Sequence, residues 1–562
     1  MRPFRLVLIL LLFMLFTVST QAQAPSFEVD DCPFDVPSDQ DIECGYLTVP
    51  ENRQNPNGNT IELAVAILSS FSDSPASEPI IYLEGGPGGS AVTAPDLWFD
   101  TPFRDNHVVI LFDQRGTGYS EPSLNCTEFD EDFDSELDAI EACNDRLLSE
   151  GIDLTAYNSR ENAADVNDLR IALGYDQVNL YGVSYGTRLG LTVMRDFPEG
   201  IRSIVLDSVY PPNVETNHTL ISDTYALMTA MFDDCDADSA CSSAFPDLEN
   251  RFYAELDNLD VNPALVYDAE NDEDVELYSA DVLNTLYSQL QTTPLISAIP
   301  ASLDALANGD YDTYFELATE GADDGSFTEG DDADFDDDEA STVVDEILAE
   351  LFDDEIDTIE ALARDGDADG IYDFLIDAFD MDDDEADAIA EAFVAVYSGG
   401  NNKVINGYQG DGDVDDDSEG MFYSVQCNEE VSFLSLDTAN DVAQRSDIPQ
   451  IVVDGLIPVD EFEACEVWES GTADPIEEQA VVSDLPVLLL TASYDTATPP
   501  DWAYLAAETL SNSFVFEFAG VGHALVDGGD CPVSIALAFL YNPNAEPDDS
   551  CIASMGIDYY IP

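Results

Sequence analysis

The chain has very few basic residues. Its 562 residues include 15 lysines and arginines against 119 aspartates and glutamates, a formal net charge of -104 at pH 7, and Lys403 is the only lysine. Nucleic acids and anionic lipids are bound by clustered cations, so this composition argues against both as partners. Such an acidic surface repels itself unless salt screens it, which suggests a saline setting or, equally, an ordinary acidic secreted protein.

Long apolar segments are also scarce. The run at residues 6–18 follows Arg2 and Arg5 and is shorter than the roughly 20 residues that span a bilayer. The small-x-small pattern at 22–24 then indicates a cleavage site. The sequence therefore predicts a signal peptide over residues 1–24, cut after Ala24, and a secreted or periplasmic protein without stable membrane insertion. An uncleaved anchor is the alternative.

Closely spaced CxxC pairs, which are typical of zinc and redox sites, are absent from the chain. The ten cysteines are an even number, and in an exported chain disulfides are the expected use of cysteine. Near neighbours give the natural pairing, although the sequence alone does not prove it. The expected pairs are Cys32 with Cys44, Cys126 with Cys143, Cys235 with Cys241, Cys427 with Cys465, and Cys531 with Cys551. We expect no metal and no organic cofactor.

The first part of the chain shows the alternation of short apolar runs, turn signals and helical stretches that is typical of a mostly parallel sheet. Expected strands lie at 62–68, 80–83, 108–112, 178–181 and 201–206. From about residue 213 the sequence pattern changes to amphipathic helical segments interrupted by acidic runs. Strands are expected again at 487–490 and 514–518, which indicates a cap inserted into one sheet domain.

The pattern therefore predicts an α/β-hydrolase core, with a mostly parallel twisted sheet flanked by helices and an inserted, mainly helical cap. The expected units are a signal peptide at 1–24, a first core part at 25–212, an acidic cap at 213–421 and a second core part at 422–562. Within the cap, residues 365–370 match the first half of a calcium loop, but position twelve is Ile376 rather than a bidentate carboxylate. A plain acidic turn is therefore favoured over a calcium site.

A GxSxG pentapeptide at 182–186 places Ser184 between an expected strand and an expected helix. This context is the sharp turn that exposes a nucleophilic serine at the edge of an α/β-hydrolase sheet, and the two glycines avoid side-chain collisions there. The serine needs a base to remove its proton. Of the three histidines, His523 follows the last expected strand, whereas His107 and His218 fit structural roles.

The third member of the triad should follow the strand before the one that precedes His523. Asp495 lies at that position, and the order serine, aspartate, histidine is the one that this fold requires. Asp484 precedes the strand and Asp501 begins a helix, so both are weaker alternatives. The oxyanion hole should use the backbone amide of Tyr185, directly after the nucleophile, and that of Gly86 in the glycine-rich segment 85–89.

These motifs resemble those of the prolyl iminopeptidase and tripeptidyl aminopeptidase group of α/β-hydrolases, peptidase family S33. The similar segments are EGGPGG at 84–89, DQRGTGYS at 113–120, GVSYGTR at 182–188, LDSVYPP at 206–212, and the C-terminal part from Cys465 through Asp495 to His523. Glu84 stands where many prolyl iminopeptidases carry histidine, which moves the chain toward the tripeptidyl branch.

The resemblance implies a helical cap that admits a short peptide and holds its free α-amine with acidic side chains. Glu429 and Glu430, just after Cys427, are candidates for this role, with solvated surface as the alternative. The function expected is thus an exported exopeptidase that forms an acyl-enzyme on Ser184. The alternatives are a carboxylic-ester hydrolase with the same triad and an inactive extracellular binding module.

Overall fold

The computed structural model describes residues 25–319 and 417–562, apart from gaps at 39, 73, 131–132, 134, 269–272, 437, 439–447 and 528. The predicted signal peptide and the calcium-like segment at 365–370 lie outside the described residues. Within the described ranges, no helix combines the length and the apolar character that crossing a membrane requires.

A nine-stranded sheet forms the centre of the molecule, in the order β1-β2-β3-β5-β4-β6-β7-β10-β11. The strands are β1 (Ser26–Asp30), β2 (Ile42–Pro50), β3 (Thr60–Leu68), β4 (Ile80–Leu83), β5 (Val109–Phe112), β6 (Val178–Val183), β7 (Ile201–Asp207), β10 (Val487–Ala492) and β11 (Ser513–Phe518). From β1 to β5 the pairs are antiparallel, and from β5 to β11 they are parallel. The predicted mostly parallel sheet is confirmed.

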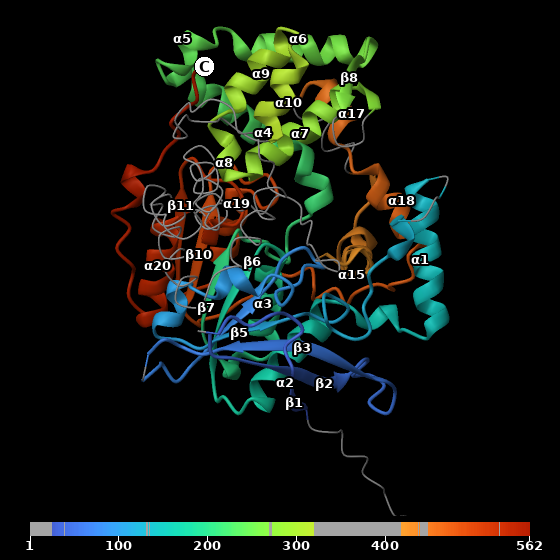
Figure 1. The fold of residues 1–562 in the computed structure, drawn as a ribbon, viewed down its shortest axis with the longest axis vertical. Helices are drawn as coiled ribbons and strands as arrows, with labels where there is room; N and C mark the ends of the chain where they lie inside the picture. The colour runs from blue at the N-terminus through green and yellow to red at the C-terminus, as the bar shows by residue number, and fades with distance from the viewer. Residues whose placement is uncertain are drawn as a thin grey trace, which may run out of the picture.

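Helices cover both faces of this sheet (Figure 1). Alternate residues of β4 belong to different apolar clusters, Ile81 and Leu83 to one and Ile80 and Tyr82 to the other. This is the two-face burial expected of a parallel strand, and it explains why β4 is apolar at every position. The covering helices are α2 (Ser159–Ala172), α3 (Tyr185–Asp196), α19 (Pro500–Ala507) and α20 (Asp530–Tyr541). Helix α1 (Glu136–Glu150) lies to one side and contributes to the apolar cluster of one face.

Most of the described elements between β7 and β10 form a helical layer with its own apolar cluster, at the top of Figure 1. Its elements are α4 (Thr216–Ala237), α5 (Cys241–Ala244), α6 (Leu248–Val261), β8 (Ala264–Asp268), β9 (Glu273–Leu277), α7 (Ser279–Gln291), α8 (Thr293–Ile296), α9 (Ile299–Ala307), α10 (Tyr311–Thr319) and α17 (Gln450–Leu456). Helices α15 (Glu419–Val425) and α18 (Val459–Val467) instead contribute to a cluster of the sheet domain. The cap thus includes a segment that follows α15 in sequence.

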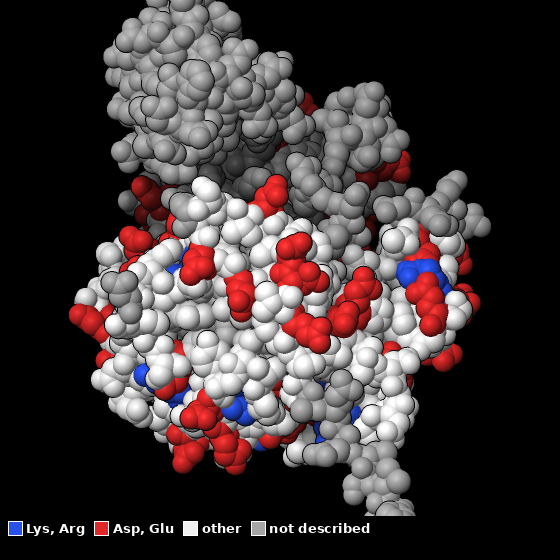
Figure 2. All heavy atoms as spheres, turned by 60° about the horizontal axis from the view of Figure 1, so that its bottom comes forward, with Lys and Arg blue, Asp and Glu red and all other residues white. Residues whose placement is uncertain are grey.

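Five disulfides join the ten cysteines in the expected pairs. Three of them tie elements of the sheet domain, one closes the turn after α4 in the cap, and Cys427–Cys465 links the segment after α15 to α18. No described cysteine is free. Acidic side chains are scattered over the face of the core seen in Figure 2, where few basic side chains reach the surface.

Candidate active site

Ser184 lies at the turn between β6 and α3, at the carboxyl edge of the sheet. Its backbone has φ 54° and ψ -125°, a strained conformation for a residue with a side chain. A Cβ on Gly182 would collide with the Gly186 carbonyl group, and one on Gly186 would collide with the carbonyl oxygen of Leu83. The glycines of the pentapeptide are therefore required by the tightness of the turn, as the sequence indicated.

Asp495 follows β10, and His523 follows β11. Because the two strands are parallel neighbours, their carboxyl ends bring both residues to the same edge of the sheet. His523 Nδ1 lies 2.9 Å from each oxygen of the Asp495 carboxylate. Thr498 steadies that carboxylate, donating its backbone N–H to Oδ1 at 2.8 Å and its hydroxyl to Oδ2 at 2.6 Å. Asp495 can thus fix the orientation of the imidazole ring.

Burial and charge act in opposite directions on this pair. Burial alone opposes ionisation of His523, but the charge and hydrogen bond of Asp495 outweigh burial and raise the pKa of the imidazole above its ordinary value. Burial likewise opposes ionisation of Asp495, and the charge of His523 with the bonds from His523 and Thr498 lowers the pKa of the carboxyl overall. Asp495 is therefore a carboxylate at neutral pH and stabilises an imidazolium.

Ser184 and His523 are both described, and no hydrogen bond joins their side chains in this structure. In enzymes without substrate this bond is often long or poorly aligned. The two residues are instead linked through the end of β7. The backbone carbonyl of Asp207 accepts the Ser184 N–H at 3.0 Å, and the Asp207 carboxylate accepts the N–H groups of Leu525 and Val526, just after His523.

The other histidines have structural partners. His107 Nδ1 lies 3.0 Å from the carbonyl oxygen of Glu78, and His218 Nδ1 lies 3.1 Å from a carboxylate oxygen of Glu215. Of the alternative acids, Asp484 is exposed before β10, and Asp501 stands in the first turn of α19. Neither of these acids hydrogen-bonds to His523.

The glycine-rich segment after β4 lies against the nucleophile. A Cβ on Gly85 would sit 3.1 Å from the Cβ of Ser184, and Gly86 has φ 99°, which disfavours any residue with a side chain. Among the described residues, neither the Gly86 nor the Tyr185 backbone N–H donates to a protein acceptor. Both amides are therefore available as the predicted donors to an oxyanion.

The DQRG segment supports this glycine-rich segment, a role that sequence reasoning did not assign. The buried Asp113 carboxylate accepts bonds from the Ser90 hydroxyl and from the backbone N–H groups of Ala91, Val92 and Tyr119. Gln114 donates to the carbonyl of Glu84 at 2.9 Å. Burial raises the pKa of Asp113 to about 6, although its four hydrogen bonds pull in the opposite direction.

Glu429 and Glu430 are buried rather than solvated, each 1% exposed. Glu429 accepts bonds from the backbone N–H and hydroxyl of Ser159, at 2.6 and 2.7 Å, and from Arg188 at 3.2 Å. Glu430 lies 2.6 Å from Arg188, and Glu478 lies 3.4 Å from it. Three carboxylates thus surround one guanidinium, on the turn of α3 that follows Ser184.

Burial, more than the excess of negative charge, raises the pKa values of two of these acidic groups. Burial, opposed by Arg188, raises the pKa of Glu430 to about 7. Burial and the neighbouring carboxylates raise the pKa of Glu478 to about 8. A cation placed among these carboxylates would offset their repulsion, as the bound α-amine of a peptide would.

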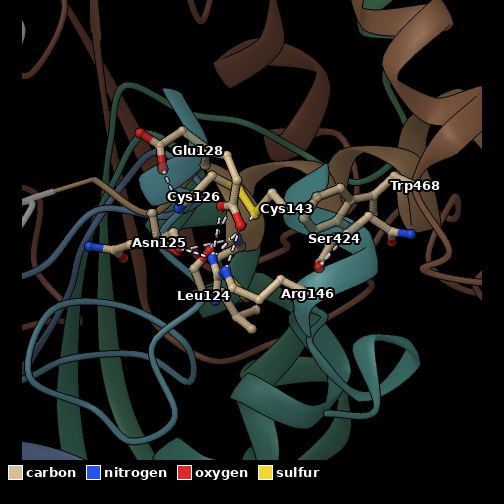
Figure 3. The surroundings of a disulfide bond; sticks show 12 residues. Leu124, Asn125, Cys126, Glu128, Cys143, Arg146, Ser424 and Trp468 are labelled. Carbon is tan, nitrogen blue, oxygen red and sulfur yellow. Dashed lines mark hydrogen bonds and ion pairs between the residues drawn. A yellow bond between two sulfur atoms is a disulfide. The ribbon is translucent and has the colours of Figure 1, made fainter. Parts of the chain in front are cut away.

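One group of the described residues has the spacing of a metal site, namely Cys126, Glu128 and Cys143. Figure 3 shows that the two sulfur atoms are joined in a disulfide and that Glu128 pairs with Arg146, at 2.6 Å. Neither a thiolate nor a free carboxylate is therefore offered to an ion. The group ties η3 (Thr127–Asp130) to α1 and has a structural role.

Comparison with known proteins identifies two segments of the chain. Residues 78–289, which include Ser184 and both expected oxyanion donors, match the α/β-hydrolase fold family. Residues 458–551, which include Asp495 and His523, match the TAP-like protein family. The chain has the α/β-hydrolase fold. The prediction of an α/β-hydrolase fold with a tripeptidyl-aminopeptidase-like C-terminal segment is confirmed.

Several curated relatives of this α/β-hydrolase are named as peptidases. It is 32% identical over 222 residues to a tripeptidyl aminopeptidase of Streptomyces lividans, with 35% of this chain and 40% of the relative covered. It is 28% identical over 200 residues to serine protease Hip1 of Mycobacterium bovis, covering 31% and 36%. It is 28% identical over 136 residues to a proline iminopeptidase of Xylella fastidiosa, covering 24% and 34%. The matches span less than half of each relative.

Proposed function

We propose that the protein is a secreted serine exopeptidase that removes short units from the N-terminus of peptides, as a tripeptidyl or prolyl aminopeptidase. The observation that carries this proposal is the hydrogen-bonded pair of Asp495 and His523 at the sheet edge from which Ser184 emerges. The names of the relatives support the peptidase reading. Five disulfides support export, because such bonds persist in oxidising compartments.

In the proposed reaction, His523 takes the hydroxyl proton of Ser184 while the serine oxygen attacks the scissile carbonyl carbon. The backbone N–H groups of Gly86 and Tyr185 stabilise the oxyanion of the tetrahedral intermediate. The imidazolium, stabilised by Asp495, then gives its proton to the leaving amine, and the C–N bond breaks. Water, deprotonated by His523, hydrolyses the acyl-enzyme and restores the serine hydroxyl.

The carboxylates around Arg188 are the proposed site for the substrate's free α-amine. Both oxygens of Glu429 are already used by Ser159 and Arg188. Glu430 is the better candidate of the two, because burial raises its pKa to about 7 in spite of the pairing of its Oε1 with Arg188. A bound ammonium group would favour the ionised form of Glu430 and would set the distance from the N-terminus to the scissile bond.

A substrate panel tests this proposal. Chromogenic aminoacyl and tripeptidyl substrates with a free amine are compared with their N-acetylated forms and with simple acyl esters, at low and high salt. We expect a strong preference for the free amine, and we expect Glu430→Gln to reduce kcat/KM for free-amine substrates by about tenfold or more while leaving the N-acetylated forms unchanged. Glu463→Gln, at an exposed position of α18, is the matched control.

The panel also separates the rival readings. Equal cleavage of free and N-blocked substrates, or efficient cleavage of simple acyl esters alone, would identify a carboxylic-ester hydrolase instead. No turnover by folded protein on any substrate would favour the inactive binding module.

A further inference from the structure

The end of β7 contacts each of the three segments that carry the residues of the candidate triad. We propose that Asp207 and Ser208 are positioning residues that hold the loop of His523 against the turn that carries Ser184. The inference rests on the proposed serine hydrolase, because it assigns how that active site is assembled. Neither residue belongs to the triad or to the oxyanion hole.

Three consecutive backbone N–H groups of the histidine loop donate to these two side chains. The N–H of Ala524 donates to Ser208 Oγ at 3.0 Å. The N–H groups of Leu525 and Val526 donate to Asp207 Oδ1 and Oδ2, both at 2.8 Å. Asp207 and Ser208 are completely buried. The residues directly after His523 therefore have their backbone donors fixed by two adjacent side chains.

The local backbone explains why consecutive amides converge on one point. Ala524 has φ 62°, and the short helix η9 (Leu525–Asp527) begins immediately after it. The first N–H groups of a helix have no partner inside the helix and need an external acceptor. A buried carboxylate that accepts two of them fits this need.

The same two residues also contact the segments that carry Ser184 and Asp495. The Asp207 carbonyl accepts the N–H of Ser184 at 3.0 Å, and the Ser208 N–H donates to the carbonyl of Leu490, in the strand that leads to Asp495, at 3.1 Å. Four non-glycine residues among those described have positive φ, and Ser184, Ser208 and Ala524 are three of them. Strain of this kind persists only where the surroundings impose it, as they do here.

Asp207 also acts on His523 by its charge. The charged groups that face the imidazole are Asp495, from the loop after β10, and Asp207, from β7. Tyr287, on α7, faces Asp495, and the Tyr181 hydroxyl, on β6, donates to Asp207 Oδ2 at 2.9 Å. Burial opposes the imidazolium, Asp495 favours it most strongly, and Asp207 adds a smaller contribution in the same direction. The Asp207 carboxylate therefore has two effects that can be separated. Its hydrogen bonds tether the loop of His523, and its negative charge favours the imidazolium.

Two variants separate the tether from the charge. Asp207→Asn removes the charge and weakens the tether, so we expect a lower pKa for His523 and a kcat reduced by about 10- to 100-fold at little change in KM. Ser208→Ala removes one tether and no charge, so we expect a reduced kcat with the pKa of His523 unchanged. Asp168→Asn is the matched control, since its carboxylate pairs with Arg53, and it should change neither quantity.

The pKa is measured on the intact protein by NMR of histidine labelled at Cε1. The chain has three histidines, so comparison with His523→Gln assigns the signal, and this readout needs no substrate. Folded Asp207→Asn with the wild-type pKa and kcat would overturn the inference. If that variant does not fold, Ser208→Ala decides, and wild-type kcat there would overturn it. Failure of the wild type to react with a fluorophosphonate would instead refute the proposed function, while the pKa comparison would still test the charge of Asp207.

Discussion

At the scale of single residues, the site depends on how one carboxylate is held. Both oxygens of Asp495 accept bonds from Thr498 and lie within hydrogen-bonding distance of His523. The carboxylate is fully buried, so its charge is not screened by solvent and must be compensated by these partners. This arrangement selects the tautomer of His523 that leaves Nε2 free to accept a proton.

Replacing Asp495 by asparagine should therefore remove activity and keep the shape of the site. An amide would offer an N–H to the imidazole and favour the wrong tautomer. We expect Asp495→Asn to lower kcat by roughly 10³- to 10⁴-fold with the circular dichroism spectrum unchanged. A variant that keeps more than about a tenth of wild-type kcat would contradict the role of Asp495.

The pH dependence of the reaction should reflect the raised pKa of His523. The base works only when its imidazole is neutral, so kcat/KM should increase as the pH rises through this pKa. Because Asp495 and Asp207 raise the pKa of the imidazole, the acid limb should lie at a higher pH than that of an ordinary histidine, and it should move to lower pH in Asp207→Asn. A profile of kcat/KM against pH for both proteins measures this, and an acid limb below the ordinary range would contradict it.

The residues of the candidate triad could be located in the sequence because each follows a recognisable strand. Ser184 is marked by its two glycines, and only one of the three histidines follows the last strand. The supporting residues could not be assigned in this way. Asp113 and Asp207 act by accepting bonds from backbone N–H groups, and such contacts leave no pattern in the sequence.

At the scale of elements, the predicted strands of the parallel half lie within one or two residues of the observed ones. The predicted strand at 80–83 has the observed bounds, because strands buried on both faces are continuously apolar. β1 and β2 were not predicted. Their burial is partial, and β2 mixes Cys44, Gly45 and Tyr46 with apolar residues, so the alternating signal of a half-exposed strand is weak.

The end of α7 and the start of α8 hold the histidine loop from the side of the cap. Gln291 accepts the N–H of His523 through its carbonyl oxygen at 2.6 Å, and the Thr293 hydroxyl accepts the N–H of Gly522 at 3.0 Å. The carbonyl of Tyr287 accepts the hydroxyl of Thr496, next to Asp495, at 2.9 Å. The cap and the triad loops are thus joined by hydrogen bonds at this contact.

Loss of the Thr293 hydroxyl should loosen this loop. We expect Thr293→Val to lower kcat by roughly three- to tenfold and to speed amide hydrogen exchange over residues 521–526. Asn284→Ala, at an exposed position of the preceding helix α7, should change neither. Unaltered exchange in folded Thr293→Val would show that the cap does not brace the loop.

At the scale of the whole molecule, the net charge of -104 is the dominant feature. This charge follows directly from the composition. Several of the few arginines do not reach the surface, since Arg104, Arg115 and Arg188 are buried. The surface therefore has little positive charge to balance its carboxylates, as the face in Figure 2 shows. That α17 packs into the cap could not be predicted, because its short apolar segment is equally compatible with the sheet domain.

Self-repulsion of this size should make stability depend on salt. Ions shorten the range of repulsion between exposed carboxylates, so we expect Tm to rise between about 0.01 M and 1 M NaCl, where the Debye length falls from about 30 to 3 Å. Differential scanning calorimetry in NaCl, with sucrose as the uncharged comparison, measures this. A Tm that is independent of NaCl would contradict the expectation.

Labelling by a fluorophosphonate, located by peptide mass spectrometry, tests most directly whether Ser184, His523 and Asp495 form a working triad. The predicted result is one adduct on Ser184, absent from Ser184→Ala and slower by several orders of magnitude in folded His523→Ala. An adduct on a different residue, or labelling of His523→Ala at the wild-type rate, would contradict it.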